Sequence, residues 1–309
     1  MWTTRRDFEV TLFGSYELCG LKRARKHGSM GSVLWQVRAD EKIEVPSTTI
    51  VGLSVLDDLI SDAILWFNCF SALIPQYVRV CAGKTDADLF RCLSALGMKL
   101  VQDSIVTRDL IRGGYDVQAR NLLRSINEHV NTIYYICIVP NVCGEFMLTQ
   151  DEESANTFWY KHIRKARKVI DAKVKQILNV ENFSHYRDDC QKILSTAHHP
   201  SYWAACNCFI TPHKGDNMLY YICGIPSDNS FFTGRLLFYM LAELAGCIGA
   251  LNGDVEKFIV RKRRDLFSKY VVKGRRHLVI MLYALIMNWN APIFDLSTEM
   301  KDFREALSK

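Results

Sequence analysis

The chain has 309 residues, of which 49% are hydrophobic, and its net charge is +6, so it is long and apolar enough to bury a large core. This composition excludes an intrinsically disordered protein. Its 11 cysteines follow no regular spacing and often stand in apolar stretches, which is typical of a reducing compartment and excludes a disulfide scaffold. The first residues lack the apolar core of a signal peptide, so we expect a cytoplasmic protein.

The first 48 residues differ from the rest of the chain. Short alternating runs around Phe8 to Phe13 and Val33 to Val37 are separated by a basic stretch, which predicts an N-terminal arm that is extended or contains short strands. Pro46 marks its end. We expect a helical domain over residues 49–309, and its first helix, from about Thr49, is predicted to end at Pro75.

A helical hairpin is predicted next. One helix begins at about Asp86 and stops at Gly113 and Gly114, and a second covers about Tyr115 to Val139 before Pro140. Further helices are expected over 151–178, 185–198, 230–251, 255–272, 276–288 and 300–307, with a short strand over 218–223. The predicted fold is therefore mostly α, a multi-helix bundle that follows the N-terminal arm.

Two apolar segments are too short or too polar for a transmembrane helix, which needs roughly 20 apolar residues. Leu236 to Leu251 contains Glu243, and Leu278 to Met287 is bounded by polar residues. We therefore expect core helices and no membrane partner, although membrane disruption by the first segment is a third functional hypothesis. The buried Glu243 needs a partner or a proton, and Arg124 and His199 are candidate partners.

The helix from Tyr115 to Val139 carries charged residues on a regular pattern. At about 100° per residue, one face is apolar and the opposite face forms a polar stripe. The apolar face consists of Leu122, Leu123, Ile126, Val130, Ile133, Tyr134 and Cys137, and the stripe of Asn121, Arg124, Glu128, Asn131, Thr132 and Tyr135. His129 lies about 140° from Arg124 around the helix.

The run from Leu110 to Glu128 resembles the signature of a bacterial helical domain of uncharacterised function, in which an arginine and a glutamate stand four residues apart after a glycine-ended helix. Members of that family also tend to carry a serine helix that ends in a His-Pro pair, to which Ser195 to Pro200 is similar. This resemblance covers roughly residues 86–200.

The run from Arg124 to His129 also resembles the arginine and histidine pattern of HEPN ribonucleases, helical proteins of toxin and antiphage systems. The resemblance implies a HEPN-like bundle that cuts RNA at a dimer interface without a metal. Arg124 would stabilise the phosphate charge, Glu128 would orient Arg124, and His129 or His199 would transfer the proton. It also implies a homo-oligomer, or a complex with another defence-system protein.

The residues allow a structural interpretation as well. On a straight helix Arg124 and His129 diverge, so a shared site requires a bend or a second subunit. Arg124 and Glu128 would otherwise form a buried ion pair that holds helices in register, and His129 would be a core histidine. Both interpretations fit the sequence.

Basic residues gather in two groups, at Lys161, Arg164, Lys165, Arg167 and Lys168 and between Arg261 and Arg276. Such groups attract phosphates, although many are only solvated helix faces. We assign RNA binding to the second group, namely Arg261, Lys262, Arg263, Arg264, Arg275 and Arg276.

Neither a metal nor a cofactor is expected. Cys190, Cys206, Cys208 and His213 do not have the spacing of structural zinc sites, and the sequence has no phosphate loop or dinucleotide-binding glycine motif. The leading hypothesis is a bacterial defence or toxin-type effector that cuts or binds RNA. The alternative is a non-catalytic helical module that recognises a nucleic acid or a partner protein of a defence system.

Overall fold

The computed structural model describes residues 47–81, 84–178, 187, 190, 193–195, 210–212, 219–221, 226, 228–260 and 266–288. The predicted N-terminal arm, His199, the basic residues 261–264 and the predicted helix 300–307 lie outside the described residues. In the described part, the mostly α, multi-helix architecture is confirmed.

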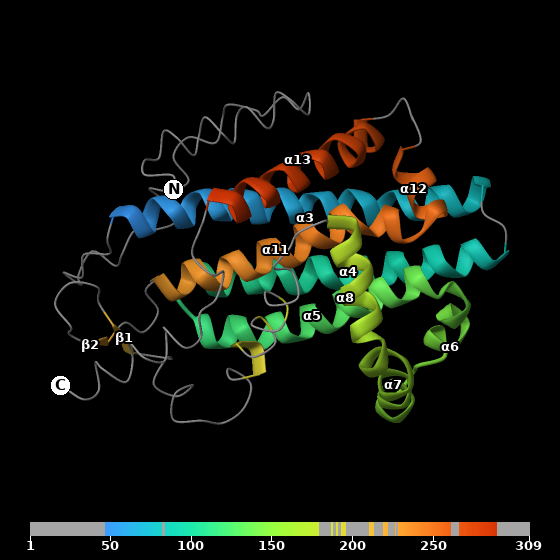
Figure 1. Cartoon of the computed structure of the whole chain (residues 1–309), viewed down its shortest axis with the longest axis horizontal. Coiled ribbons are helices and arrows are strands. Elements are labelled where there is room, and N and C mark those ends of the chain that lie inside the picture. Colours follow the sequence, from blue (N-terminus) through green and yellow to red (C-terminus); the bar gives the residue numbers. More distant parts are fainter. Residues whose placement is uncertain are drawn as a thin grey trace.

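Among the described residues, five long helices lie along the length of the bundle (Figure 1). They are α3 (Ser47–Cys81), α4 (Lys84–Arg112), α5 (Asp116–Ile138), α11 (Asp228–Leu251) and α13 (Leu266–Asn288). Helix α11 contacts all four others, and α4 lies between α3 and α5. The apolar side of each helix therefore faces a shared core.

Shorter elements follow α5 and cross the bundle. They are η1 (Pro140–Val142), α6 (Cys143–Met147), α7 (Glu152–Phe158), the π-helical turn η2 (Trp159–Ile163), α8 (Arg164–Leu178) and, after α11, α12 (Gly253–Val260). Figure 1 shows α8 crossing the direction of the long helices. The predicted strand near 218–223 matches β2 (Leu219–Tyr221), which pairs antiparallel with β1 (Ile210–Pro212).

The predicted hairpin between α4 and α5 is confirmed. Gly114 has a φ of 70°, a left-handed conformation that glycine adopts at no steric cost. The amide of Tyr115 donates to the carbonyl of Leu110 at 2.9 Å, which closes the end of α4. This short turn brings the two helices into contact side by side.

Helix α3 continues through Pro75 to Cys81, so the predicted end at Pro75 is wrong. A proline inside a helix leaves the carbonyl four residues earlier without its amide donor. Here that carbonyl belongs to Ser71, and the hydroxyl of Ser94 on α4 donates to it at 3.3 Å. Tertiary packing thus compensates for the lost bond.

The predicted break between residues 272 and 276 is also wrong, because α13 runs without interruption from Leu266 to Asn288. Gly274 lies inside it, and a Cβ there would come within 3.0 Å of the Trp66 ring. The indole of Trp66 donates to the Val271 carbonyl at 2.8 Å. The glycine therefore allows α13 to approach α3 closely.

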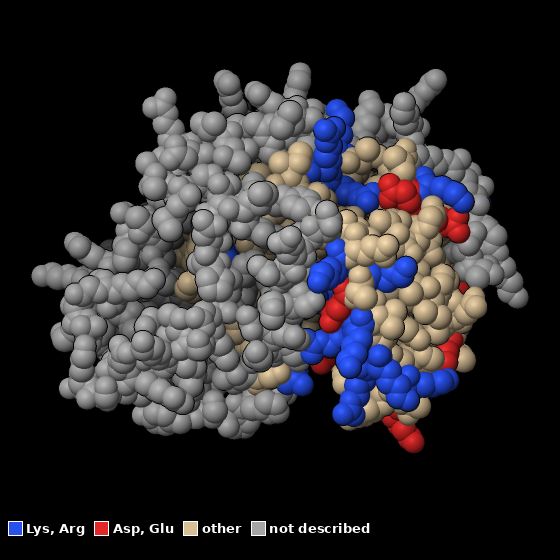
Figure 2. Space-filling view, viewed as in Figure 1, with Lys and Arg blue, Asp and Glu red and all other residues tan. Residues whose placement is uncertain are grey.

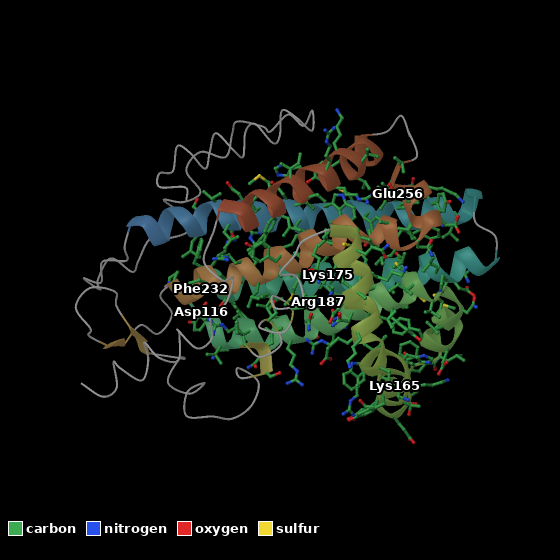
Figure 3. The ribbon with its side chains drawn as sticks, viewed as in Figure 1. Asp116, Lys165, Lys175, Arg187, Phe232 and Glu256 are labelled. Atoms are coloured by element: carbon green, nitrogen blue, oxygen red, sulfur yellow. The ribbon has the colours of Figure 1, made fainter. Side chains whose placement is uncertain are left out.

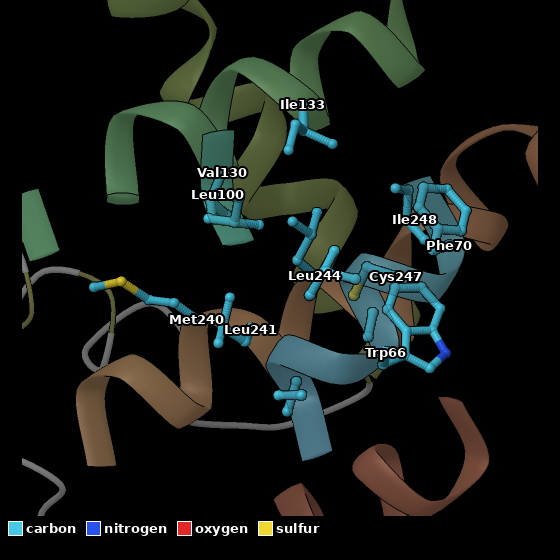
Figure 4. Packing of buried hydrophobic residues seen from close by; sticks show 14 of the residues in the cluster. Trp66, Phe70, Leu100, Val130, Ile133, Met240, Leu241, Leu244, Cys247 and Ile248 are labelled. Carbon is cyan, nitrogen blue, oxygen red and sulfur yellow. The ribbon is translucent and has the colours of Figure 1, made fainter. Parts of the chain in front are cut away.

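The core is continuous through the bundle, as the close-up in Figure 4 shows for Trp66, Leu100, Val130 and Leu244. By length and composition, Leu53–Arg79 and Ser230–Leu251 are apolar enough to cross a membrane, and 61% and 89% of those apolar windows are buried in the bundle. Core helices of folded bundles have the same properties. The absence of a membrane partner stays a prediction.

Candidate nucleic-acid interface

The predicted two-sided pattern of α5 is confirmed for most positions. The apolar face is buried except for Leu122, which is half-buried, whereas Arg124 and Glu128 are partly exposed. The Arg124 Nε lies 3.7 Å from the Glu128 Oε1, and the two side chains are 28% and 47% exposed. This pair lies within one helix and therefore does not join two helices.

His129 faces away from that pair. Its Nδ1 lies 3.6 Å from the Asp103 Oδ2 on α4, and its side chain is 25% exposed. Burial lowers the pKa of His129, an effect that the nearby Asp103 carboxylate opposes. Within one chain Arg124 and His129 do not meet, as the helical angle predicts.

Glu243 is buried and has partners other than the predicted Arg124. The Tyr134 hydroxyl donates to its Oε1 at 2.8 Å, and the Arg187 Nη1 donates to the same oxygen at 3.2 Å. Arg124 was the wrong partner because it belongs to the polar stripe of α5, whereas α11 packs against the opposite side, where Tyr134 lies.

Arg187 lies in the predicted helix 185–198 but was not singled out, because its partners Glu243 and Asn131 lie 56 positions away along the chain. Its Nε lies 2.8 Å from the Asp171 Oδ1 on α8, and its Nη2 donates to the Asn131 side chain on α5. Figure 3 shows Arg187 close to α8 and α5. We call Arg187, Glu243, Asp171, Asn131 and Tyr134 the buried network, and it joins α5, α8 and α11.

Burial raises the pKa of Glu243, and the charge of Arg187 and the Tyr134 hydrogen bond act against that rise. Buried charges of this kind persist when each one is paired and hydrogen-bonded. The buried network therefore has the properties expected of residues that hold α5, α8 and α11 together.

The single helix predicted over 151–178 is divided in the structure into α7, η2 and α8. Asp151 caps α7, because its Oδ1 accepts from the Ser154 amide at 2.7 Å. The chain then widens into the π-helical turn η2 before α8 begins at Arg164. Single π-turns inside helices occur often at functional sites.

Side chains of α5 and α6 hold η2 in place. The Tyr135 hydroxyl and the His162 Nδ1 lie 3.2 Å apart, and the His162 Nε2 lies 3.0 Å from the Glu145 Oε2. The Lys161 Nζ donates to the Glu145 Oε1 at 2.8 Å. Hydrogen bonds from Lys161 and then His162 lower the pKa of Glu145. This contact fixes the direction in which the next residues of α8 point.

Helix α8 has a buried apolar side and an exposed basic side. Ala166, Ile170, Val174 and Leu178 are buried. We call the exposed cations the α8 basic face, and they are Arg164, Lys165, Lys168, Lys173 and Lys175. The one acidic residue of α8, Asp171, is bound to Arg187 in the buried network. Figure 2 shows Lys and Arg side chains gathered over α8 and the turn before it.

An open surface pocket of about 760 Å³ borders the start of this basic face. It lies along the outer face of the consecutive elements α7, η2 and α8, and its lining includes Tyr160, Asn156, Glu153 and Lys165. Tyr160 is 54% exposed, and the Arg164 guanidinium lies over its ring at 5.5 Å. The sequence pattern gave no sign of this pocket, because the π-turn that shapes it has no residue signature.

The second predicted basic group is described only in part. Arg275 is turned toward the protein, where it donates to Glu256 at 2.6 Å and to the Gly246 carbonyl at 3.0 Å. Arg276 is exposed. Its assignment to RNA binding, and that of residues 261–264, stays a prediction.

Among the described residues, no group of three or more His, Cys, Asp or Glu side chains is placed to hold a metal ion. Cys190 is buried. Comparison with known proteins gave no match to a family model, a curated protein or a solved structure.

Proposed function

We propose that this protein is an RNA-binding helical module that holds the phosphate backbone on the α8 basic face. The observation that carries the proposal is that the exposed side of α8 presents five cations, whereas its one acidic residue, Asp171, is half-buried and paired with Arg187 and Arg167. Lysines on such a surface displace the counterions of a nucleic acid, and this release supplies most of the sequence-independent affinity.

The choice of RNA rests on the resemblance of the Arg124 to His129 run to HEPN ribonucleases. The same resemblance supports a role in a bacterial defence or toxin system, with a second copy or another defence protein as partner. The α8 basic face adds independent support for a polyanion, since it lies on a different helix from that run.

Charge reversal on α8 tests the proposal. The double variant Lys165→Glu/Lys168→Glu is expected to bind fluorescein-labelled RNA at least about tenfold more weakly than the natural chain, because two phosphate contacts become repulsive. The control is Lys257→Glu, an exposed lysine on a different helix, α12. Equal affinity of the double variant and the control would contradict the proposal.

RNA cleavage is a second candidate, favoured by one feature of Arg124. Its Nη1 is buried and has no hydrogen-bond partner among the described residues, although the side chain as a whole is partly exposed. The part of the guanidinium that is exposed carries a positive charge that can stabilise a phosphate. His129 lies apart from it, so the reaction would need a second copy to bring the two together.

Cleavage is tested with purified protein and RNA in chelator. If Arg124 acts on the phosphate, Arg124→Ala lowers the cleavage rate about 100-fold or more while RNA affinity is retained. Loss of activity in His129→Ala, together with recovery in a mixture of the two inactive variants, would assign the site to a dimer. If the natural protein leaves the RNA intact, cleavage is contradicted and RNA binding remains as the proposed activity.

A further inference from the structure

The pocket beside Tyr160 has a chemistry that differs from the rest of the α8 basic face. Its lining combines an exposed aromatic ring with the Asn156 amide, the carboxylates of Glu152 and Glu153 and the ammonium groups of Lys161 and Lys165. The two carboxylates offset the two lysines, so a phosphate group gains little by entering. A nucleic-acid base, by contrast, carries a π-face and an edge of hydrogen-bond donors and acceptors.

We infer that this pocket receives one unpaired base of a single strand whose phosphates lie on the α8 basic face. This inference rests on the proposed function and deepens it by naming the form of nucleic acid that is bound. The base stacks on Tyr160, and its edge faces Asn156 and Glu153. A base in a duplex is stacked and paired, so it cannot enter without leaving the helix.

The geometry of η2 supports the role of Tyr160. Trp159 packs edge-on against Tyr160 with ring centroids 5.1 Å apart, and Arg164 lies over the Tyr160 ring. His162 in the same turn is anchored to Glu145 and Tyr135, so η2 is held rigidly while Tyr160 faces solvent. A ring that is fixed before binding loses little conformational entropy when a base stacks on it.

The size of the pocket and its neighbours also fit a base. The pocket is open to solvent and has a volume of about 760 Å³, so one base has room to enter it. Lys165 lines the pocket and belongs to the α8 basic face, so a strand with its base in the pocket has its phosphate beside this lysine. The carboxylates accept hydrogen bonds from exocyclic amino groups, which favours cytosine or adenine over uracil.

The test compares single-stranded RNA, DNA of the same sequence and the matched RNA duplex, each labelled with fluorescein. Tyr160→Ala is expected to weaken single-strand binding about tenfold, because stacking on one aromatic side chain is lost, and to leave duplex binding unchanged. Tyr160→Phe keeps the ring and is expected to retain the affinity. The control is Val169→Ala, an equally exposed apolar residue on α8 (53% exposed).

Base preference gives a second readout. Cytosine 12-mers are expected to bind more tightly than uracil 12-mers, and Glu153→Gln is expected to reduce that difference. The inference is overturned if Tyr160→Ala behaves like Val169→Ala, or if the duplex binds as tightly as the single strand. In either case, weaker binding by Lys165→Glu/Lys168→Glu would still support the proposed function, and no RNA binding by the natural chain would overturn both.

Discussion

The inner and outer sides of α8 differ in whether their charged side chains are paired. On the inner side, Asp171 binds Arg187, and Arg187 in turn binds Glu243 in the buried network. On the outer side, Lys165, Lys168 and Lys175 stand exposed, and the one acidic residue of α8, Asp171, is half-buried and paired with Arg187 and Arg167. Buried charges require partners for the protein to fold, whereas exposed cations without an ion-pair partner among the described residues remain available to an external anion.

Arg124 and Glu128 differ from the buried network in their burial. These residues look like a buried pair in the sequence, but the structure places them at the surface of α5, 3.7 Å apart. The buried charge between α5, α8 and α11 is instead supplied by Arg187 and Glu243, with Asp171 as a second partner of Arg187. A structural role and a candidate binding role therefore belong to different sets of residues.

The largest effect is expected inside the core. Glu243→Leu leaves Arg187 with one carboxylate fewer and removes the acceptor of the Tyr134 hydroxyl, so the free energy of unfolding should fall by about 3 kcal/mol or more. Urea denaturation followed by circular dichroism measures the change. The double variant Arg187→Met/Glu243→Leu should recover part of it, because the buried guanidinium is removed together with its carboxylate and Asp171 keeps Arg167 as a partner.

If Glu243→Leu lowers the free energy of unfolding by less than about 1 kcal/mol, the buried network contributes no more than an exposed ion pair does. That result would contradict the distinction between the two sides of α8. Arg124→Ala provides the matched comparison at the surface. This variant is expected to lower the free energy of unfolding by no more than about 1 kcal/mol.

A smaller effect is expected from pH at the anchor of η2. Because hydrogen bonds lower the pKa of Glu145 in the folded chain, its contribution to stability is present above the ordinary value of 4.5 and is lost as the pH falls through the lowered pKa. The difference in melting temperature between the natural chain and Glu145→Gln should therefore shrink on acidification below pH 4.5. A difference that is constant with pH would show that the Glu145 charge does not hold η2.

Regular periodicity made much of the fold predictable. The α4–α5 hairpin followed from Gly113 and Gly114, and the apolar face of α5 followed from three- and four-residue spacing. Pro75 and Gly274 gave wrong predictions because tertiary contacts decide their effect. Ser94 satisfies the carbonyl that Pro75 leaves open, and Trp66 packs where Gly274 has no side chain.

The candidate site was less predictable for similar reasons. The basic run at the start of α8 is visible in the sequence, but which of its residues face outward depends on the π-turn at Trp159 to Ile163. The pairing of Glu243 with Arg187 joins residues 56 positions apart, and local periodicity contains no information about such a contact. Tyr160 gained its significance only when the structure placed it at a pocket.

The most direct test of the central claim is the salt dependence of RNA binding. We predict that the logarithm of the association constant falls linearly with the logarithm of salt concentration, and that Lys165→Glu/Lys168→Glu lowers the magnitude of this slope by about 1 to 2. The same slope for the double variant and the natural chain would show that the phosphate backbone does not lie on the outer side of α8.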